Sequence, residues 1–295
     1  MSEPPAEPSR ASISSERGLA SYLIGRTVLQ HCASVLSPLG IWVLPLKGIW
    51  LQHFVYPDKG ERLITDVDVL VPQTRYAQAR AALLRAGWQL QVENTSEASF
   101  MLPGFPLAID LHADLYTRGV FHTSLQGIFA RGRPDSQVFG CQVLSPDPLD
   151  VLSHLVGHAL KSGNAWAGAD KPRNELRDIP RLVQVFQLSP ERCAARLTAD
   201  GLARAARFVL PLIAAEPAPG FAEQALACLP ADALGTQLAR AARKLKQLQP
   251  DSQRAHTVVG FMLDSSVWRA GYALSLRVID LLDAPGRAAA HSGRP

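Results

Sequence analysis

The feature that most constrains the fold is a change of pattern at Asp147 and Pro148. Before this point the chain alternates between short β-branched apolar runs and amphipathic stretches, whereas every long stretch after it has helical spacing. Pro is favoured in the first turn of a helix, so Pro148 marks a helix start. The order predicts an α/β (α+β) fold, in which a region of strands and helices packs against an all-helical C-terminal region.

Composition and pattern divide the chain into four segments. The ends, 1–12 and 284–295, are rich in Pro, Ala, Gly and Ser, which predicts disordered tails. Between them we expect an α/β domain over 13–146 that opens with a helix over 13–37, and a helical domain over 147–283. The expected helices of the second domain are 147–162, 174–187, 189–214, 219–228, 231–247 and 253–282.

Composition narrows the environment and the partners. A hydrophobic share of 47% and a charged share of 19% are typical of globular proteins. No stretch approaches the roughly 18 apolar residues of a membrane span, and the N-terminus lacks the features of a secretory signal, so we expect a cytoplasmic protein without a membrane partner. The net charge of +4 is spread along the chain, which fits an anionic substrate better than a nucleic acid. The four cysteines have no CxxC spacing and receive no chemical role.

Two aspartates lie in the strand predicted for 63–71, "LITDVDVLV". Side chains two apart on a strand share a face, so Asp66 and Asp68 point the same way and the valines fill the other face. Two like charges this close are unfavourable unless a cation lies near them. A solvated outer face is the simpler interpretation of such a pair.

A third aspartate favours a metal site. The stretches "WQLQVE" (88–93) and "ASFMLPG" (98–104) predict a hairpin that leads into another apolar strand, over 106–116. Asp110 lies in this strand, which could pair beside the first strand. Asp114 is an alternative third ligand. Clustered carboxylates suit Mg²⁺ or Mn²⁺, and two such ions can hold both the attacking and the leaving oxygen of a phosphoryl transfer.

Basic residues near these strands could contact phosphate. Lys47 and Gly48 follow a short strand predicted for 41–48, where the glycine lets the backbone approach a phosphate and the next helix presents its N-terminus. Arg62 precedes Asp66 by four residues and could reach the same phosphates.

The order of these stretches resembles a known family. "PLKG" (45–48), "YPDKGERLITDVDVLV" (56–71) and "IDLH" (109–112) look like the motifs K-G, Tyr-Pro, R-x-x-x-D-[IV]-D-x-L-V and D-L-H of an uncharacterised bacterial nucleotidyltransferase family within the DNA polymerase beta superfamily. "HLVGHALKSG" (154–163) and "ELRDIPRLV" (175–183) resemble the helical part of that family. The similarity runs from about residue 40 to about residue 187.

The resemblance implies a nucleotidyltransferase-type mixed sheet with a metal site. In it, Asp66 and Asp68 bind Mg²⁺, and Asp110 completes the site and helps to deprotonate the acceptor hydroxyl. Lys47 and Gly48 stand where many superfamily members carry Gly-Ser or Gly-Gly, so a lysine would act as a point charge on the phosphates in place of a serine hydroxyl.

The same resemblance places a further residue among the nucleotide-binding group. Thr65 occupies the position that a Gly or Ser often holds before the first aspartate. The expected nucleotide- or phosphate-binding residues are Lys47, Gly48, Arg62 and Thr65.

Several other side chains are candidates for substrate contact or for support of the site. His112 shares a strand face with Asp110, while His154 and His158 lie four apart on one helix face with Lys161 nearby. The Glu of an H-E-x-x-H motif is missing, so we expect the two helical histidines to pack or hydrogen-bond near the cleft rather than to bind zinc.

Two further candidates lie downstream. Arg177 and Asp178 are expected to form a structural pair or a phosphate clamp. The tryptophans are expected in the core or at an interface, although Trp166 could instead stack on a base.

These observations favour a metal-dependent enzyme with Mg²⁺ or Mn²⁺ as cofactor. It would transfer a nucleoside monophosphate from an NTP, ATP being the first choice, to an unidentified acceptor: a protein, a peptide or a small molecule. Kinase-like phosphoryl transfer at the same site is an alternative, and so is a non-catalytic module that binds nucleotide or docks a partner. Three intact carboxylates favour the enzyme over the module.

Overall fold

The computed structural model describes residues 10–116, 121–161, 174–248 and 263. The predicted C-terminal tail and the predicted helix over 253–282 lie outside these residues. The first helix, α1 (Arg10–Leu36), begins three residues inside the predicted N-terminal tail. None of the described helices combines the length and apolar character that a membrane crossing requires.

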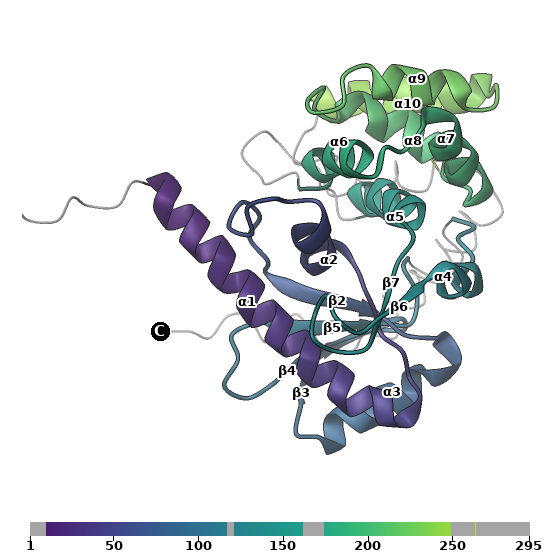
Figure 1. Ribbon diagram of the computed structural model, residues 1–295. Coiled ribbons are helices and arrows are strands. Elements are labelled where there is room, and N and C mark those ends of the chain that lie inside the picture. The colour runs from purple at the N-terminus through teal and green to yellow at the C-terminus, as the bar shows by residue number, and fades with distance from the viewer. Residues whose placement is uncertain (1–9, 117–120, 162–173, 249–262, 264–295) are drawn as a thin grey trace, which may run out of the picture.

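A five-stranded mixed sheet forms the centre of the first half of the chain (Figure 1). The strand order is β1-β2-β5-β4-β3, and within it only β2 and β5 run parallel. The predicted mixed sheet is therefore confirmed, as is the predicted hairpin, which is β3 and β4. The bounds are β1 Leu44–Pro45, β2 Asp66–Leu70, β3 Gln89–Glu93, β4 Glu97–Met101 and β5 Ala108–His112.

The two faces of the sheet have different partners because strand side chains alternate. Val67 and Val69 of β2 and Ile109 and Leu111 of β5 are fully buried in the core shared with α1 and with α3 (Tyr76–Arg85). The opposite face carries the polar residues of the same strands. One strand thus buries its valines and presents its aspartates to the other side.

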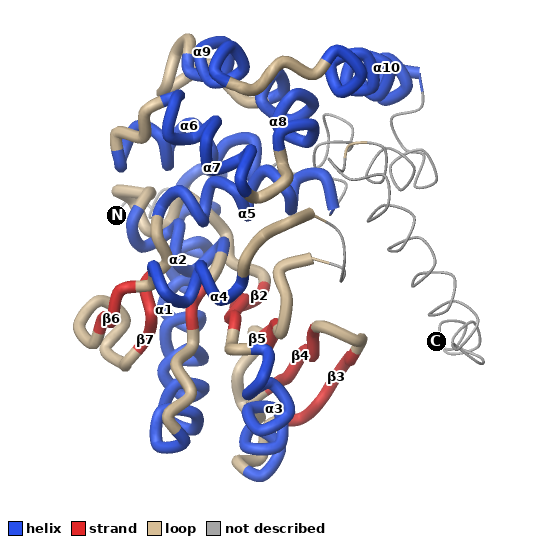
Figure 2. Tube along the Cα trace, turned by 90° about the vertical axis from the view of Figure 1, so that its right-hand side faces the viewer, coloured by secondary structure: helices blue, strands red, loops and turns tan. Residues whose placement is uncertain are grey.

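Helix α2 (Lys47–Phe54) connects the sheet to the helical region. Its Ile49 belongs to the core under the sheet, whereas Trp50 belongs to the larger core of the helical region. The Trp50 ring stacks on Phe186 at 5.5 Å between ring centroids, and its indole N–H donates to the Ser145 hydroxyl at 2.9 Å. The two halves therefore pack into one body, as Figure 2 also shows.

A helix and a small hairpin between the two halves were missed by the sequence analysis. Helix α4 (Leu125–Arg131) is capped by Ser124, and β6 (Arg133–Asp135) pairs with β7 (Val143–Ser145). The hairpin docks on the sheet edge through the Leu144 N–H, which donates to the Val43 carbonyl at 2.9 Å. Strands of three residues carry too few side chains to show an alternating pattern.

Among the described residues, the helical region departs from the prediction at one helix. A single helix was expected over 189–214, but the chain turns at Gly201, whose φ is 72°. There the N–H of Leu202 donates to the Leu197 carbonyl and that of Gly201 to Thr198, the hydrogen-bond pair of a Schellman motif. The observed helices are α5 Pro148–Lys161, α6 Asn174–Phe186, α7 Pro190–Ala199, α8 Ala203–Val209, α9 Phe221–Cys228 and α10 Ala233–Leu248.

Helix α1 packs closely against the turn that leads into β2. A Cβ added to Gly18 would lie 1.9 Å from the Gly60 carbonyl oxygen, and one added to Gly60 would lie 2.4 Å from the Ser15 carbonyl oxygen. The Ser21 hydroxyl donates to the Gly18 carbonyl at 2.8 Å and accepts from the Ile64 N–H at 3.0 Å. Two glycines are therefore required for this approach, and the turn is held against α1.

Candidate active site

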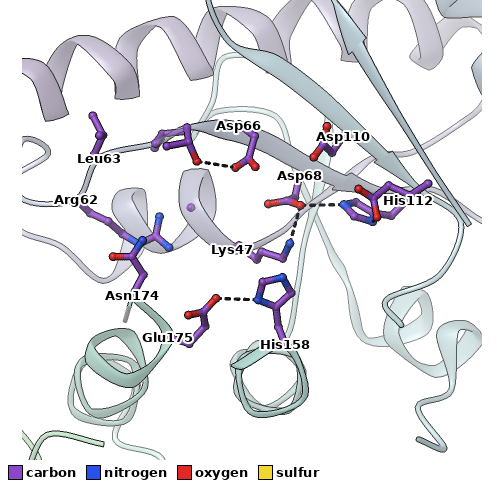
Figure 3. A pocket seen from close by; sticks show the side chains of 14 residues that line it. Lys47, Arg62, Leu63, Asp66, Asp68, Asp110, His112, His158, Asn174 and Glu175 are labelled. Carbon is purple, nitrogen blue, oxygen red and sulfur yellow. Dashed lines mark hydrogen bonds and ion pairs between the residues drawn. The ribbon is translucent and has the colours of Figure 1, made fainter. Parts of the chain in front are cut away.

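A cavity of about 340 Å³ lies between the sheet and the helical region. Figure 3 shows strand β2 with Asp66 and Asp68 on one side, helices with His158 and Glu175 on the other, and Lys47 between them. Every residue predicted as catalytic or phosphate-binding lines this cavity: Lys47, Gly48, Arg62, Thr65, Asp66, Asp68 and Asp110. Stretches far apart in the sequence thus meet at one site.

The three aspartates come together through the parallel pairing of β2 and β5. Asp68 is directly opposite Asp110, and Asp66 is opposite Ala108. The side chains share one face because they are two apart or in register. The three aspartates therefore lie on one face of the sheet and line the same cavity.

Asp68 is the most deeply held carboxylate of the three. Its side chain is 4% exposed, and its Oδ1 accepts from Lys47 Nζ at 2.7 Å and contacts His112 Nε2 at 2.8 Å. Burial alone would raise the pKa of Asp68, but Lys47 and His112 hold it well below its usual value. Asp68 is thus a charged, acceptor-only group at the floor of the cavity.

The pKa values of the two neighbouring carboxyl groups, Asp66 and Asp110, are shifted in the opposite direction. Burial and the charge of Asp68 raise the pKa of Asp66 to about 6, although Lys47 offsets part of the effect. Burial also raises the pKa of Asp110, again with a contribution from Asp68 and against a hydrogen bond from Ser99. The cavity therefore holds more negative charge than its own cations balance.

The donor set fits a divalent cation. One ligand atom each from Asp68, Asp110 and His112 lies within 4.8 Å of the others. The Oδ1 atom of Asp110 is buried and has no hydrogen-bond partner among the described residues. His112 takes the place in this compact group that the sequence analysis gave to Asp66, which lies on the same strand face. A cation here would balance the crowded carboxylates.

A cationic side chain and a helix N-terminus lie beside the carboxylates at the start of α2. Lys47 begins this helix with a φ of 41°, an uncommon conformation for a residue with a side chain. Burial works to lower the pKa of Lys47, but Asp68 outweighs it and the net shift is upward. A permanently charged ammonium group and a helix N-terminus thus face the same cavity.

Arg62 lines the cavity while being held from behind. Its Nε and Nη2 donate to the carboxylate of Asp178 on α6, at 3.1–3.2 Å. Its Nη1 approaches Gly48 so closely that a Cβ added there would lie 2.8 Å away. Thr65, the last of the predicted phosphate contacts, donates its hydroxyl to Asp66 at 3.3 Å.

The helical side of the cavity carries imidazole and acid. His158 Nδ1 lies 2.7 Å from Glu175 Oε1. Burial and the charge of Lys47 lower the pKa of His158, and Glu175 opposes the shift. His154 does not line the cavity: it is buried behind, its ring 5.6 Å from that of His158, and its pKa is far below the usual value because of burial. It packs there, one of the two roles expected.

Two expectations for the helical region are corrected or lie outside the description. Arg177 and Asp178 do not pair with each other, because Arg177 is 55% exposed and pairs with Glu61 while Asp178 is fully buried against Arg62. Successive residues of a helix point in different directions, which separates these two. The side chains of Lys161 and Trp166 lie outside the described residues.

Three polar lining residues were missed by the sequence analysis: Glu97, Asn174 and Glu175. Glu97 is opposite His112 across β4 and β5, and its carboxylate lies 3.7 Å from His112 Nδ1. Asn174 and Glu175 open α6. The alternation of Glu97 and Ser99 in the predicted hairpin was the one available signal. Such a pattern does not indicate which residues of neighbouring strands lie opposite each other.

Comparison with solved structures finds weak overall similarity to nucleotidyltransferases. The solution structure of the antibiotic-resistance factor ANT(2'')-Ia is 14% identical and covers 59% of this chain and 89% of that one, with a TM-score of 0.40. An antigenic nucleotidyltransferase-like protein from Paracoccidioides brasiliensis is 17% identical and covers 80% and 93%, with a TM-score of 0.38. A CCA-adding enzyme from Thermotoga maritima, complexed with tRNA, is 13% identical and covers 90% and 86%, with a TM-score of 0.27.

Sequence families give a firmer result. Among curated proteins none matches the chain. The profile of a family described as "Uncharacterised nucleotidyltransferase" matches residues 26–215, which is more than half of the chain and includes all the cavity residues named above. The enzyme class predicted from the sequence is confirmed: the chain belongs to this family of uncharacterised nucleotidyltransferases.

Proposed function

We propose that the protein transfers a nucleoside monophosphate from an NTP to an acceptor hydroxyl, with Mg²⁺ or Mn²⁺ held by Asp66, Asp68 and Asp110. ATP is the first choice of NTP, and the acceptor is a protein, a peptide or a small molecule. Two further points stay predictions from the sequence. One is that the family is bacterial and lies within the DNA polymerase beta superfamily, and the other is that the protein is cytoplasmic.

One observation carries the proposal. Asp68 and Asp110 are in register on the parallel strands β2 and β5, and Lys47 and the N-terminus of α2 lie beside them in the same cavity. A site that places cation ligands beside an anion-binding position is suited to a metal-bound polyphosphate. Bound divalent cations would neutralise phosphate charge and align the attacking and leaving oxygens.

The residues of the chain would divide the remaining work. Lys47, the backbone at Gly48 and Arg62 would hold the β- and γ-phosphates, so that charge developing on the departing pyrophosphate meets fixed positive groups. His112 would orient Asp68 through the 2.8 Å contact with its Oδ1. These groups are in place before substrate arrives, which avoids reorganisation during the reaction.

The proton balance of the transfer points to Asp110. The acceptor oxygen forms a bond to the α-phosphorus, the bond from that phosphorus to the bridging oxygen breaks, and pyrophosphate leaves with the electron pair. The acceptor proton moves to the Asp110 carboxylate, whose Oδ1 is buried and has no hydrogen-bond partner among the described residues. A carboxylate oxygen that is not already engaged can take up the proton.

The experiment that tests the proposal identifies the product. The protein is incubated with Mg²⁺, each NTP in turn, and pools of peptides, proteins and small molecules, and the acceptors are analysed by mass spectrometry. An added nucleoside monophosphate mass, with release of pyrophosphate, is the expected result. Addition of phosphate alone would replace nucleotidyl transfer by the kinase-like alternative.

A matched pair of variants tests the assignment of the third ligand. Asp110→Asn removes the proposed ligand and base, whereas Asp114→Asn changes another aspartate just beyond the end of β5 that does not line the cavity. We expect Asp110→Asn to abolish transfer and Asp114→Asn to retain it. Equal activity of the two variants would refute the site.

A further inference from the structure

We infer that Asp178 is a positioning residue for nucleotide binding: from the helical region it fixes Arg62 so that one guanidinium nitrogen faces the phosphate position beside Gly48. The inference rests on the proposed function. It extends that function to a residue that does not line the cavity.

The geometry divides the guanidinium between two tasks. Nε and Nη2 of Arg62 form a two-pronged contact with the Asp178 carboxylate, with three N–O distances of 3.1–3.2 Å. Nη1 is the nitrogen that approaches Gly48 at the start of α2. A planar guanidinium held on one edge presents the other edge in a fixed direction.

Burial makes this arrangement costly to abandon. The Arg62 side chain is 10% exposed and that of Asp178 is fully buried. Burial works against the charge of Arg62, but Asp178 outweighs it and raises the pKa of the guanidinium. A buried charge that loses its partner is strongly destabilised, so Arg62 without Asp178 would turn to other carboxylates. Glu175, which also lines the cavity and acts on the charge of Arg62, is one such carboxylate.

A tyrosine fixes the carboxylate in its turn. The Tyr56 hydroxyl donates to Asp178 Oδ1 at 2.5 Å, and burial followed by the charge of Asp178 raises the pKa of Tyr56 far above its usual value. The guanidinium of Arg181 lies 4.7 Å from the centre of the Tyr56 ring. Tyr56 and Arg62 lie on either side of one turn, and α6 supplies both Asp178 and Arg181.

This network assigns a task to the helical region. The sheet provides the carboxylates, while α6 reaches across to the turn that carries Arg62. Phosphate binding would therefore depend on the packing of α6 against the first half of the chain, although Asp178 itself does not contact the phosphate.

The experiment is a double-mutant cycle on nucleotide affinity. Isothermal titration with Mg²⁺ and each of the four NTPs gives the Kd of the wild type, Arg62→Gln, Asp178→Asn and the double variant. We expect Arg62→Gln to weaken binding by roughly tenfold to a hundredfold. Asp178→Asn should weaken it comparably, and the double variant no further, because Asp178 acts through Arg62. Asp178→Glu should restore part of the affinity.

A matched control separates positioning from stability. Arg131 and Asp150 form a similar pair away from the cavity, with N–O distances of 2.9 and 2.7 Å. Asp150→Asn should lower the melting temperature yet leave the Kd unchanged. If Asp178→Asn does not fold, Tyr56→Phe replaces it, with an expected weakening of a few-fold.

The outcomes that overturn the inference differ from those that overturn the function. Asp178→Asn that binds NTP as tightly as the wild type, or more tightly, would show that Asp178 merely balances charge. If the losses of affinity in the two single variants add in the double variant, Arg62 and Asp178 act independently. Arg62→Gln with wild-type affinity would end the inference and leave the proposed function intact, whereas a wild type that binds no NTP would end both.

Discussion

The sheet wall of the cavity and the core behind its helical wall differ in how they hold titratable groups. On the sheet wall, Asp68 contacts Lys47 at 2.7 Å and lies close enough to Asp66 and Asp110 to raise the pKa of both. Behind the helical wall, His154 is kept neutral by burial, with both ring nitrogens lacking a hydrogen-bond partner among the described residues. The sheet wall thus holds charges that are compensated or crowded, whereas the buried imidazole behind the helical wall is uncharged.

The difference teaches which wall is built for chemistry. Crowded carboxylates are unfavourable for the fold alone, so their retention on one face indicates a function that uses a cation or a proton. The buried imidazole of His154 fills space near Lys47 and adds no second positive charge there. Changes to the crowded carboxylates of the sheet wall should therefore act mainly on turnover, and changes to His154, behind the helical wall, on stability.

The largest effect is expected from Asp110→Asn on the sheet wall. Turnover should fall by about a hundredfold or more, as for the loss of other fixed catalytic charges. The melting temperature should stay equal or rise, because burial and Asp68 already disfavour the ionised form of Asp110. Assay of transfer and thermal unfolding on the same preparation checks both signs. A marked loss of stability would contradict the view that these carboxylates are crowded.

Lys47→Met should have the next largest effect. It leaves the 4% exposed Asp68 carboxylate without its ammonium partner, which costs about 3 kcal/mol of unfolding free energy, the lower end for a buried pair. Urea denaturation measures this loss. The double variant Lys47→Met/Asp68→Asn should be more stable than Lys47→Met alone, since no buried charge is then left unpaired. The reverse order would mean that the pair contributes little.

His154→Phe tests the helical wall through pH. Because the folded-state pKa of His154 is lowered, the unfolded state binds the proton first, and stability is lost as pH falls below about 6.5. One such group contributes at most about 1.4 kcal/mol per pH unit. His154→Phe should flatten the dependence of unfolding free energy on pH by that amount, while His122→Phe, at an exposed position, should not. If the unfolding free energy of the wild type and of His154→Phe depended on pH with the same slope, His154 would take up its proton in the folded state.

Arg177→Ala should have the smallest effect. Its guanidinium is 55% exposed and pairs with Glu61 at 3.8 Å, so its loss should change the unfolding free energy by no more than about 0.5 kcal/mol. Transfer activity should be that of the wild type, because Arg177 does not line the cavity. A tenfold loss of activity would show that Arg177 contributes to substrate binding or turnover.

The sheet wall could be predicted from the sequence because its information is local. Asp66 and Asp68 share a strand, and an apolar strand of known period fixes which side chains point together. Asp110 required only that its strand pair beside the first. The Lys47 and Gly48 turn was visible as a strand followed by a helix, and the family resemblance supplied the order of the pieces.

The helical wall could not be predicted to the same depth because its contacts join distant elements. Arg62 meets Asp178 across 116 positions of the chain, and helical periodicity says nothing of which face of α6 lies against which turn. Glu97 depends on strand register, and the break at Gly201 on a local motif hidden within a continuous helical pattern. Pairing between elements is set by packing, which a single sequence does not display.

The close approach of Gly18 to Gly60 bears on where the chain can be cut. The family match begins at residue 26, within α1, so a chain trimmed to that match would lose Gly18, Ser21 and the surface on which the Gly60 turn rests. That turn leads directly to Arg62. The smallest unit that keeps the Arg62 turn supported therefore starts upstream of the matched family segment, near the beginning of α1.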